Sequence, residues 1–342
     1  MTENPAPPLA GTDDSGTNSN PAVAMAAGLY RQVRHFAGAL GALVVIFVGL
    51  SISQDFFLTK GNILNVLTAN SSLLIAAVGL TFIIISAGFD LSLGAIFAAA
   101  GYVVWRAIES GVPPWLALVL GTVLAGLLGG AVNGVLVGKF RLNFFVVTLG
   151  TSSLFTGVLE VITNGQTNAI AMPEGGAIEW LGNGELLGIR VPVIVALVVV
   201  LLAGYVLRFT SLGRAIYAVG GNPEAARLAG INVTAVYISV YAIAGFLAGV
   251  AGVVDASRLA SADPTAGSTL ALTAAAGVLL GGTSFFGGIG GVSGTVVGVL
   301  LMAFLSNGLN ILGISAWWQG VITGLVLVLA VILDKLQTRA SR

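Results

Sequence analysis

The chain has 342 residues, of which 56% are hydrophobic and only 8% are charged, and its mean hydropathy is +1.00. Soluble globular domains carry about 25% charged residues, so this composition excludes an ordinary soluble protein and indicates one embedded in a lipid bilayer. The net charge of zero identifies no partner, since in a membrane protein the placement of charge matters more than its sum. Cysteine is absent, which excludes disulfides, thiol catalysis and thiolate metal sites.

The first 29 residues are rich in Pro, Gly, Ser, Thr, Asn and Ala. They lack the basic start and apolar core of a signal peptide, so we expect a disordered cytoplasmic tail over 1–29 and no cleaved leader. The one histidine, His35, lies beside Arg34 directly before the first apolar run. We expect it to flank the membrane and not to act as a ligand or base.

Long apolar runs follow along the rest of the chain. A helix of about 20 residues crosses the hydrocarbon core of a bilayer. On that measure the sequence predicts an all-α polytopic membrane protein with ten transmembrane helices, at 36–54, 62–86, 90–109, 115–138, 142–163, 191–208, 234–255, 268–285, 291–312 and 317–334. The Gly-rich segments around 86–92 and 283–291 predict broken or re-entrant helices instead of clean loops.

The basic residues set the orientation of these helices. If the N-terminus lies in the cytoplasm, ten of the fourteen Lys and Arg residues fall in cytoplasmic segments. An excess of Lys and Arg on the cytoplasmic side is the main orientation signal of membrane proteins, so we expect both termini to be cytoplasmic. The longest outer loop, 164–190, would then dock a soluble protein, cap a path or be an ordinary surface loop.

Glycine occurs 48 times, and much of it recurs every four residues. Three predicted helices carry such series, which are Gly126, Gly130, Gly134 and Gly138; Gly245 and Gly249; and Gly290, Gly294 and Gly298. Small residues at this spacing let helices approach closely, so we expect tight packing here and not a ligand site. Asn133-Gly134 and Asn307-Gly308 occupy matching places in spans two to five and seven to ten, which suggests an inverted repeat.

A polar segment, 210–231, separates the sixth and seventh spans. Asn222 has the side chain of a helix N-cap, Pro223 suits the first helical position, Glu224 the first turn, and Gly230 the end. A short capped helix has no role inside lipid, so this segment predicts a docking site for another protein. Its candidate residues are Gly213, Gly220, Asn222, Glu224, Ala225, Ala226 and Gly230.

Catalytic signatures are missing from the sequence. The phosphate-binding pattern Gly-x₄-Gly-Lys-Ser/Thr does not occur, nor does His-Glu-x-x-His or Gly-x-Ser-x-Gly. We therefore expect no enzyme activity, no metal and no cofactor on this chain. No acidic relay is visible at membrane depth, which disfavours an ion-coupled transporter, although carbonyl groups alone can bind sodium.

Polar residues in the apolar runs are the candidates for a translocation path. They are Asp90, Asn133, Thr148, Asn307, Asn310 and Gln319. Each offers hydrogen bonds to a polar solute, and each would equally satisfy a neighbouring helix. Asp90 has a second explanation as the N-cap of the helix that begins there.

Four segments together carry a family resemblance. They are Gly88–Gly94; Asn133-Gly134 leading to Phe145–Thr151; the polar segment 210–231; and Leu280–Gly288 continuing to Asn307–Asn310. In their order and spacing they resemble the permease subunit of bacterial ATP-binding-cassette (ABC) importers of the ribose, xylose and galactose class, over residues 36–336.

This resemblance implies a function and a set of partners. The segment around Glu224 is similar to the loop that docks into the ATPase subunit, which would hold ATP and Mg²⁺. The other implied partners are a second permease subunit, identical or different, an extracytoplasmic sugar-binding protein, a monosaccharide and membrane lipid, but not nucleic acid. The chain would lie in the bacterial plasma membrane, with a solute path between two permeases.

The chain departs from the family pattern near its solute-related positions. Many members carry an acidic pair near the positions of Ala271 and Thr273, and neither acid is present here. The exact solute therefore stays open, among ribose, xylose, galactose, an inositol or a nucleoside. Two alternatives to the importer subunit are a self-contained secondary transporter or channel for a small polar solute, and a membrane scaffold without transport activity.

Overall fold

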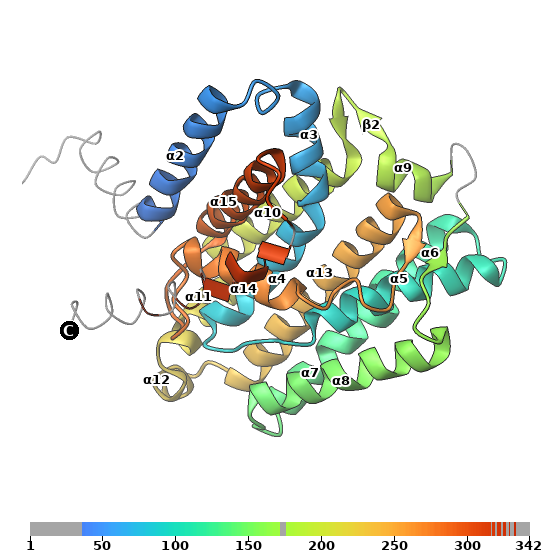
Figure 1. Ribbon diagram of the computed structural model, residues 1–342. Coiled ribbons are helices and arrows are strands. Elements are labelled where there is room, and N and C mark those ends of the chain that lie inside the picture. Colours follow the sequence, from blue (N-terminus) through green and yellow to red (C-terminus); the bar gives the residue numbers. More distant parts are fainter. Residues whose placement is uncertain are drawn as a thin grey trace, which may run out of the picture. The chain divides into compact units, whose positions relative to one another are not determined.

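The computed structural model describes residues 36–171 and 176–315, and single positions from 317 to 332 (Figure 1). The predictions for the tail 1–29 and for Gln319 lie outside these residues, as does most of the tenth span. The described helices are α2 (Ala37–Ser53), α3 (Lys60–Ala69), α4 (Ser71–Ile85), α5 (Leu93–Glu109), α6 (Pro114–Leu120), the π-helical η1 (Gly121–Leu127), α7 (Leu128–Gly138), α8 (Phe144–Thr163), α9 (Ala177–Asn183), α10 (Val191–Phe209), α11 (Ser211–Gly221), α12 (Pro223–Leu228), α13 (Val233–Leu259), α14 (Leu270–Leu280) and α15 (Val292–Ile311).

The prediction of an all-α polytopic membrane protein is confirmed. Five described helical stretches are long and apolar enough to cross a bilayer, and α3 with α4 forms a sixth that bends by 44°. The 17-residue helices α2 and α5 and the 11-residue α14 occupy three further predicted spans. In the described part of the chain, strands are confined to two short pairs, β1 (Asn168–Ala169) with β4 (Ser261–Ala262) and β2 (Glu185–Leu186) with β3 (Ile189–Arg190).

Two span boundaries differ from prediction. The span expected at 62–86 is not one straight helix, because the chain bends between α3 and α4 at Asn70. The span expected at 268–285 ends early, at Leu280, since Gly281-Gly282 follows and Gly282 adopts φ +78°. Glycine adopts that left-handed conformation at little cost, and the helix stops there.

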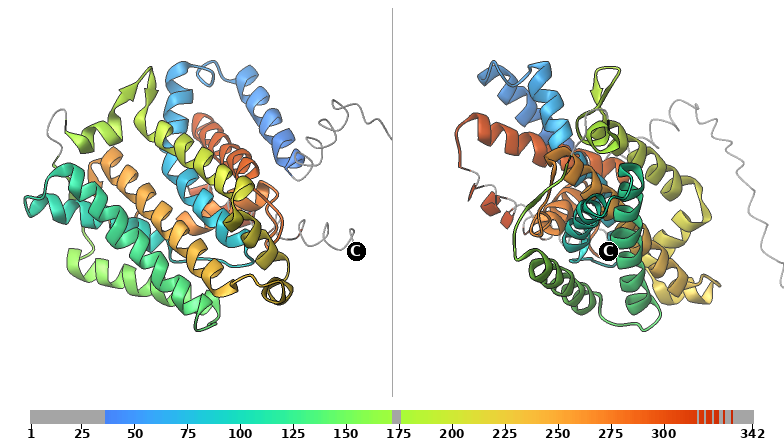
Figure 2. Two further views of the ribbon diagram at one scale, coloured as in Figure 1. Left: turned by 180° about the vertical axis from the view of Figure 1, so that it is seen from behind. Right: turned by 90° about the vertical axis from the view of Figure 1, so that its right-hand side faces the viewer.

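The longest helix, α13, forms the centre of the bundle (Figure 2). It packs against α4, α5, η1 and α7. Most of α4 is buried as well, and the largest fully buried side chain in the described chain is Tyr241 of α13. A helix that is apolar on all sides suits such an interior position.

The glycine series on α7 and α13 bring the two backbones together, as predicted. A Cβ atom at Gly130 would overlap the carbonyl oxygen of Tyr241, and one at Gly126 would lie 2.7 Å from that of Gly245. The third series is corrected in part. Gly294 and Gly298 lie on α15 and face α14, whereas Gly290 lies in the preceding loop with φ +137°.

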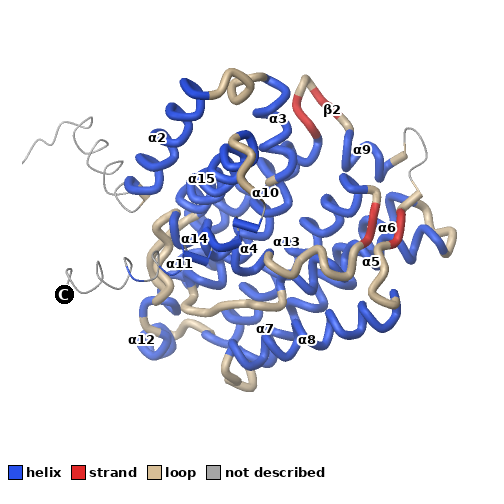
Figure 3. The backbone as a smooth tube through the Cα atoms, in the orientation of Figure 1, coloured by secondary structure: helices blue, strands red, loops and turns tan. Residues whose placement is uncertain are grey.

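Both Gly-rich segments are breaks between helices, as predicted (Figure 3). The first break, 86–92, joins α4 to α5, and the second break, 281–291, joins α14 to α15. The two meet: the amide of Gly288 donates to the carbonyl of Ile85 at 2.8 Å, and the rings of Phe89 and Phe285 lie 5.9 Å apart. Such backbone is tolerated in a membrane protein where protein buries it.

The connecting elements gather at the two ends of the bundle. Helices α11 and α12 and the α7–α8 turn lie at one end, and α9 with the β2–β3 hairpin lies at the other (Figures 1 and 2). Arg141 of the α7–α8 turn is close enough to Glu224 of α12 to act on its charge. The polar segment 210–231 is therefore part of one end face of the bundle.

Candidate functional site

The polar segment folds as two short capped helices. Thr210 caps α11 by accepting a hydrogen bond from the amide of Gly213 at 3.1 Å. Asn222 caps α12, because its Oδ1 accepts from the amides of Glu224 and Ala225, both at 3.0 Å, and Pro223 opens the helix. Gly230 follows with φ +86°. The predicted cap and stop residues are thus confirmed as structural features.

The candidate docking residues divide into two groups. Gly213, Gly220 and Ala226 are buried, and a Cβ atom at Gly213 would overlap the last carbonyls of α10. Asn222, Glu224, Ala225 and Gly230 are exposed. The first group therefore attaches the segment to the bundle, and only the second presents a surface.

An ion pair stiffens the exposed surface of α12. Arg227 Nη2 lies 2.6 Å from Glu224 Oε1, and Arg227 Nε donates to Oε2 at 3.1 Å. These hydrogen bonds and the charge of Arg227 lower the pKa of Glu224, so its carboxylate is ionised at neutral pH. Leu228 beside them is 76% exposed, and sequence reasoning missed this apolar residue.

Two of the predicted path residues form one buried network. Asp90 Oδ1 accepts from the amide and hydroxyl of Ser92 at 2.7 and 2.6 Å, and Asn133 Nδ2 donates to Ser92 Oγ at 2.7 Å. The expectation that Asp90 is an N-cap is wrong, because α5 begins at Leu93 and Ser92 holds the cap position. The Asp90 carboxylate instead closes a turn with Ser92. Ser92 in turn links the first break to Asn133 of α7.

The other predicted path residues have different surroundings. Thr148 is fully buried and donates to the carbonyl of Phe144 in its own helix at 2.8 Å. Asn307 exchanges two amide hydrogen bonds with Asn62, at 3.0 and 3.1 Å, which join α15 to α3. Asn310 is exposed near the end of α15. Among the five candidates that the structure describes, only Asp90 and Asn133 lie in one hydrogen-bonded network.

A polar cavity lies elsewhere, in a place that sequence reasoning missed. It has a volume of about 540 Å³ and opens between the start of α4, the start of α14 and the second half of α15. Most of its lining residues are apolar, such as Leu73, Met302 and Leu309. We call it the polar cavity for its Asn70, Thr269, Thr273 and Ser306 side chains, and no described lining residue is charged. Cavities of this size are typical of small-molecule sites. Of these lining residues, the sequence had pointed only to Thr273, because many members of the similar family carry an acidic residue near this position.

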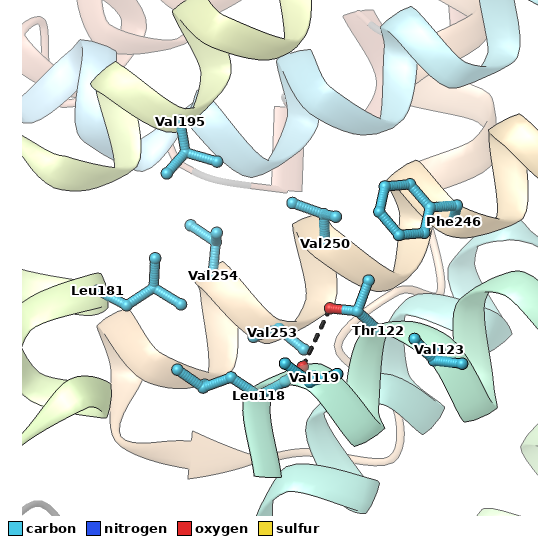
Figure 4. A pocket seen from close by; sticks show the side chains of 10 residues that line it. All are labelled: Leu118, Val119, Thr122, Val123, Leu181, Val195, Phe246, Val250, Val253 and Val254. Atoms are coloured by element: carbon cyan, nitrogen blue, oxygen red, sulfur yellow. Dashed lines mark hydrogen bonds between the residues drawn. The ribbon is translucent and has the colours of Figure 1, made fainter. Parts of the chain in front are cut away.

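A second hollow, of about 370 Å³, has the opposite chemistry (Figure 4). It lies between α6, η1, α9, α10 and α13, and apart from Thr122 its lining residues are Leu, Val and Phe. The hydroxyl of Thr122 donates to the carbonyl of Leu118 at 3.1 Å, within its own helix. This hollow offers nothing to bind a polar solute, and its surface suits lipid tails.

Known proteins that are similar to this chain identify its protein family. Residues 62–331 match the family described as "Branched-chain amino acid transport system / permease component". The chain belongs to this family. The Ribose import permease protein RbsC of Escherichia coli (strain K12) is 42% identical over 296 residues, which cover 86% of this chain and 92% of that protein. No solved structure matches the chain.

Other relatives are permeases for sugars as well. The Ribose import permease protein RbsC of Bacillus subtilis (strain 168) is 41% identical, over 86% of this chain and 91% of its own length. The D-allose transport system permease protein AlsC of E. coli (strain K12) is 39% identical, over 86% and 89%. These findings confirm the predicted family and favour an ABC-importer permease over a self-contained transporter or channel.

Proposed function

We propose that this chain is the membrane-spanning subunit of an ABC importer that moves a monosaccharide into the bacterial cell. The observation that carries the proposal is the capped, exposed helix α12 on one end of an otherwise apolar bundle of this permease family. A separate ATPase subunit would dock there, on the cytoplasmic side. The chain itself would act as conduit and mechanical link, without covalent chemistry.

The same proposal assigns the remaining partners. ATP and Mg²⁺ belong to the ATPase subunit, because this chain has no phosphate-binding loop of its own. A second permease subunit would complete the path, and an extracytoplasmic binding protein would deliver the sugar to the end that carries α9 and the β2–β3 hairpin. Both chain termini would then be cytoplasmic, in the bacterial plasma membrane.

The polar cavity supports a neutral cargo. Hydroxyl and amide groups such as those of Asn70, Thr273 and Ser306 exchange hydrogen bonds with the hydroxyls of a sugar, and a charged solute would need a charged partner. Several of the similar relatives are named for ribose, allose and arabinose. We therefore propose a pentose or hexose close to ribose, which contacts this cavity on its way through.

The decisive experiment compares uptake with and without an ATPase. The chain is reconstituted into liposomes alone, and together with an ATPase subunit and a sugar-binding protein of this importer class, and uptake of labelled ribose, allose and arabinose is measured. We expect uptake only in the complete system with internal ATP. Strong uptake by the chain alone, driven by a sugar or ion gradient, would overturn the proposal.

A further inference from the structure

Helix α11 is attached to both helix breaks at one point. The hydroxyl of Tyr217 donates to the carbonyl of Gly290 in the second break at 2.8 Å. One turn further on, a Cβ atom at Gly220 would overlap the carbonyl oxygen of Ile85, the last residue of α4, and would lie 2.8 Å from the amide of Gly288. A single face of α11 thus contacts the end of α4 and the loop between α14 and α15.

The two breaks are bonded to each other at the same point. The amide of Gly288 donates to the carbonyl of Ile85 at 2.8 Å, so one hydrogen bond next to Gly220 joins the second break to the end of α4, directly before the first break. Gly287 adopts φ +83°, and a Cβ there would lie 2.7 Å from both Ala87 Cβ and the carbonyl oxygen of Gly220. Backbone meets backbone here, without side chains that would deform and absorb a displacement.

From this point the contacts lead to the helices of the interior. Tyr241 of α13 donates from its hydroxyl to the carbonyl of Phe89 in the first break at 3.0 Å. Asn133 of α7 bonds to Ser92 at the other end of that break. The second break continues directly into α14 and α15, whose residues Thr273 and Ser306 line the polar cavity.

We propose that Tyr217 and Gly220 are the positioning residues through which movement of α12 reaches the polar cavity. Only Asn222 separates α11 from α12: its amide donates to the carbonyl of Ala218 in α11 at 3.0 Å, and its side chain caps α12. Displacement of α12 would shift Gly290 through the Tyr217 hydroxyl and shift Ile85 and Gly288 through Gly220. Helices α14 and α15 would follow. This inference rests on the proposed function, since it assumes that a partner moves α12.

The test is a Tyr217→Phe variant in the complete permease, ATPase and binding-protein complex in liposomes. The change removes only the hydroxyl, so we expect unchanged complex assembly and ATP hydrolysis, and only a small fall in thermal stability from the lost hydrogen bond. Uptake of labelled ribose per ATP hydrolysed should fall by about 2- to 10-fold, the range that corresponds to the loss of one hydrogen bond. Tyr205→Phe, on the exposed face of α10, is the matched control and should leave the ratio unchanged.

A second variant tests the contact at Gly220. Gly220→Ala adds the Cβ that would overlap Ile85, so it should lower the same ratio more strongly, whereas Gly221→Ala, with open space around it, should not. An unchanged ratio in Tyr217→Phe, or loss of ATPase binding in that variant, would overturn the inference. Failure of the proposed function itself looks different, because the wild-type complex would then show no ATP-dependent uptake.

Discussion

Polar side chains inside the bundle are paired mainly within the protein. Thr148 bonds to its own helix, and Asn307 bonds to Asn62 across 245 positions of sequence. Each pairing removes the cost of a polar group in an apolar surrounding, which is about 1–3 kcal/mol in proteins. Of these candidates, Asn307 joins α15 to α3 and Asn133 joins α7 to the first break, whereas the Thr148 hydroxyl bonds within its own helix.

The mutual pair of Asn62 and Asn307 gives a prediction of stability. Asn307→Ala leaves the Asn62 side chain, which is buried, with one fewer partner, so we expect the unfolding free energy in detergent to fall by about 1–2 kcal/mol. A double-mutant cycle with Asn62→Ala should give a coupling of about 0.6–1.7 kcal/mol. Asn65→Ala, exposed on the same helix, is the control. Strictly additive losses would show that the pair contributes nothing.

Charge reversal on α12 tests the docking surface. Glu224→Arg replaces an ion pair with Arg227 by repulsion and adds a third positive charge near Arg141. We expect normal membrane insertion, with ATP hydrolysis no longer coupled to uptake and uptake reduced by at least about 10-fold, a loss of roughly 1.4 kcal/mol in coupling. Uptake and hydrolysis in liposomes are measured together. The wild-type complex, measured in the same liposomes, is the reference, and normal transport in Glu224→Arg would reject the docking assignment.

The sequence predicted the role of a side chain only where that side chain acts on backbone neighbours within a few residues. Asn222, Pro223 and Gly230 act on their own backbone neighbours, so their spacing was enough to predict α12. The prediction for Asp90 was wrong because its carboxylate accepts from Ser92, which is itself the residue that precedes the first helical residue, Leu93. Leu228 was missed, since exposure of one leucine among many depends on how α12 packs.

Helix contact in this protein depends on glycine. On α7 and α13 the two backbones approach so closely that even one methyl group has no space at Gly130. The exposed helix α8 carries glycines too, yet a Cβ at Gly150 or Gly157 would meet nothing within 4 Å. The same residue type therefore serves close packing in one helix and leaves an open surface in another.

Replacing glycine by alanine should therefore change the stability of the protein in opposite directions on α7 and on α8. Gly130→Ala should destabilise the protein by about 1–3 kcal/mol, because the added methyl separates α7 from α13. Gly157→Ala should be neutral or stabilise by up to about 1 kcal/mol, since alanine favours a helix over glycine and finds open space. Thermal unfolding of both variants in the same detergent measures the difference. Equal effects at both positions would contradict the packing role.

Element boundaries were predictable where the chain itself contains the stop signal. The spans expected at 191–208 and 291–312 are found as Val191–Phe209 and Val292–Ile311, after Arg190 and Gly291. The π-helical turn η1 was not foreseen, because Gly121 there packs against the carbonyl of Ala100 and the side chain of Val253. Such a distortion follows from tertiary neighbours that no local pattern contains. The inverted repeat stays a prediction, and Asn133 and Asn307 have unlike partners.

At the scale of the whole molecule, the two end faces of the bundle are built from different elements. The face with α11 and α12 also holds the basic α7–α8 turn, with Lys139 and Arg141. The other face carries α9 and the β2–β3 hairpin. Since Lys and Arg concentrate on cytoplasmic surfaces, the first face is the one we assign to the cytoplasm. The docking proposal depends on this orientation, because ATPase subunits meet ATP only there.

The absence of cysteine makes this orientation directly measurable. Leu228 on α12 is 76% exposed and Leu187 in the β2–β3 turn is 95% exposed, so a single cysteine at either position is accessible without disturbing the bundle. We expect a membrane-impermeant maleimide to label Leu228→Cys in inside-out vesicles and Leu187→Cys in right-side-out cells. Adding the ATPase subunit should protect the cysteine at 228 by several-fold and leave the one at 187 unchanged. Labelling from the reverse sides would place α12 outside the cell and exclude an ATPase at that face.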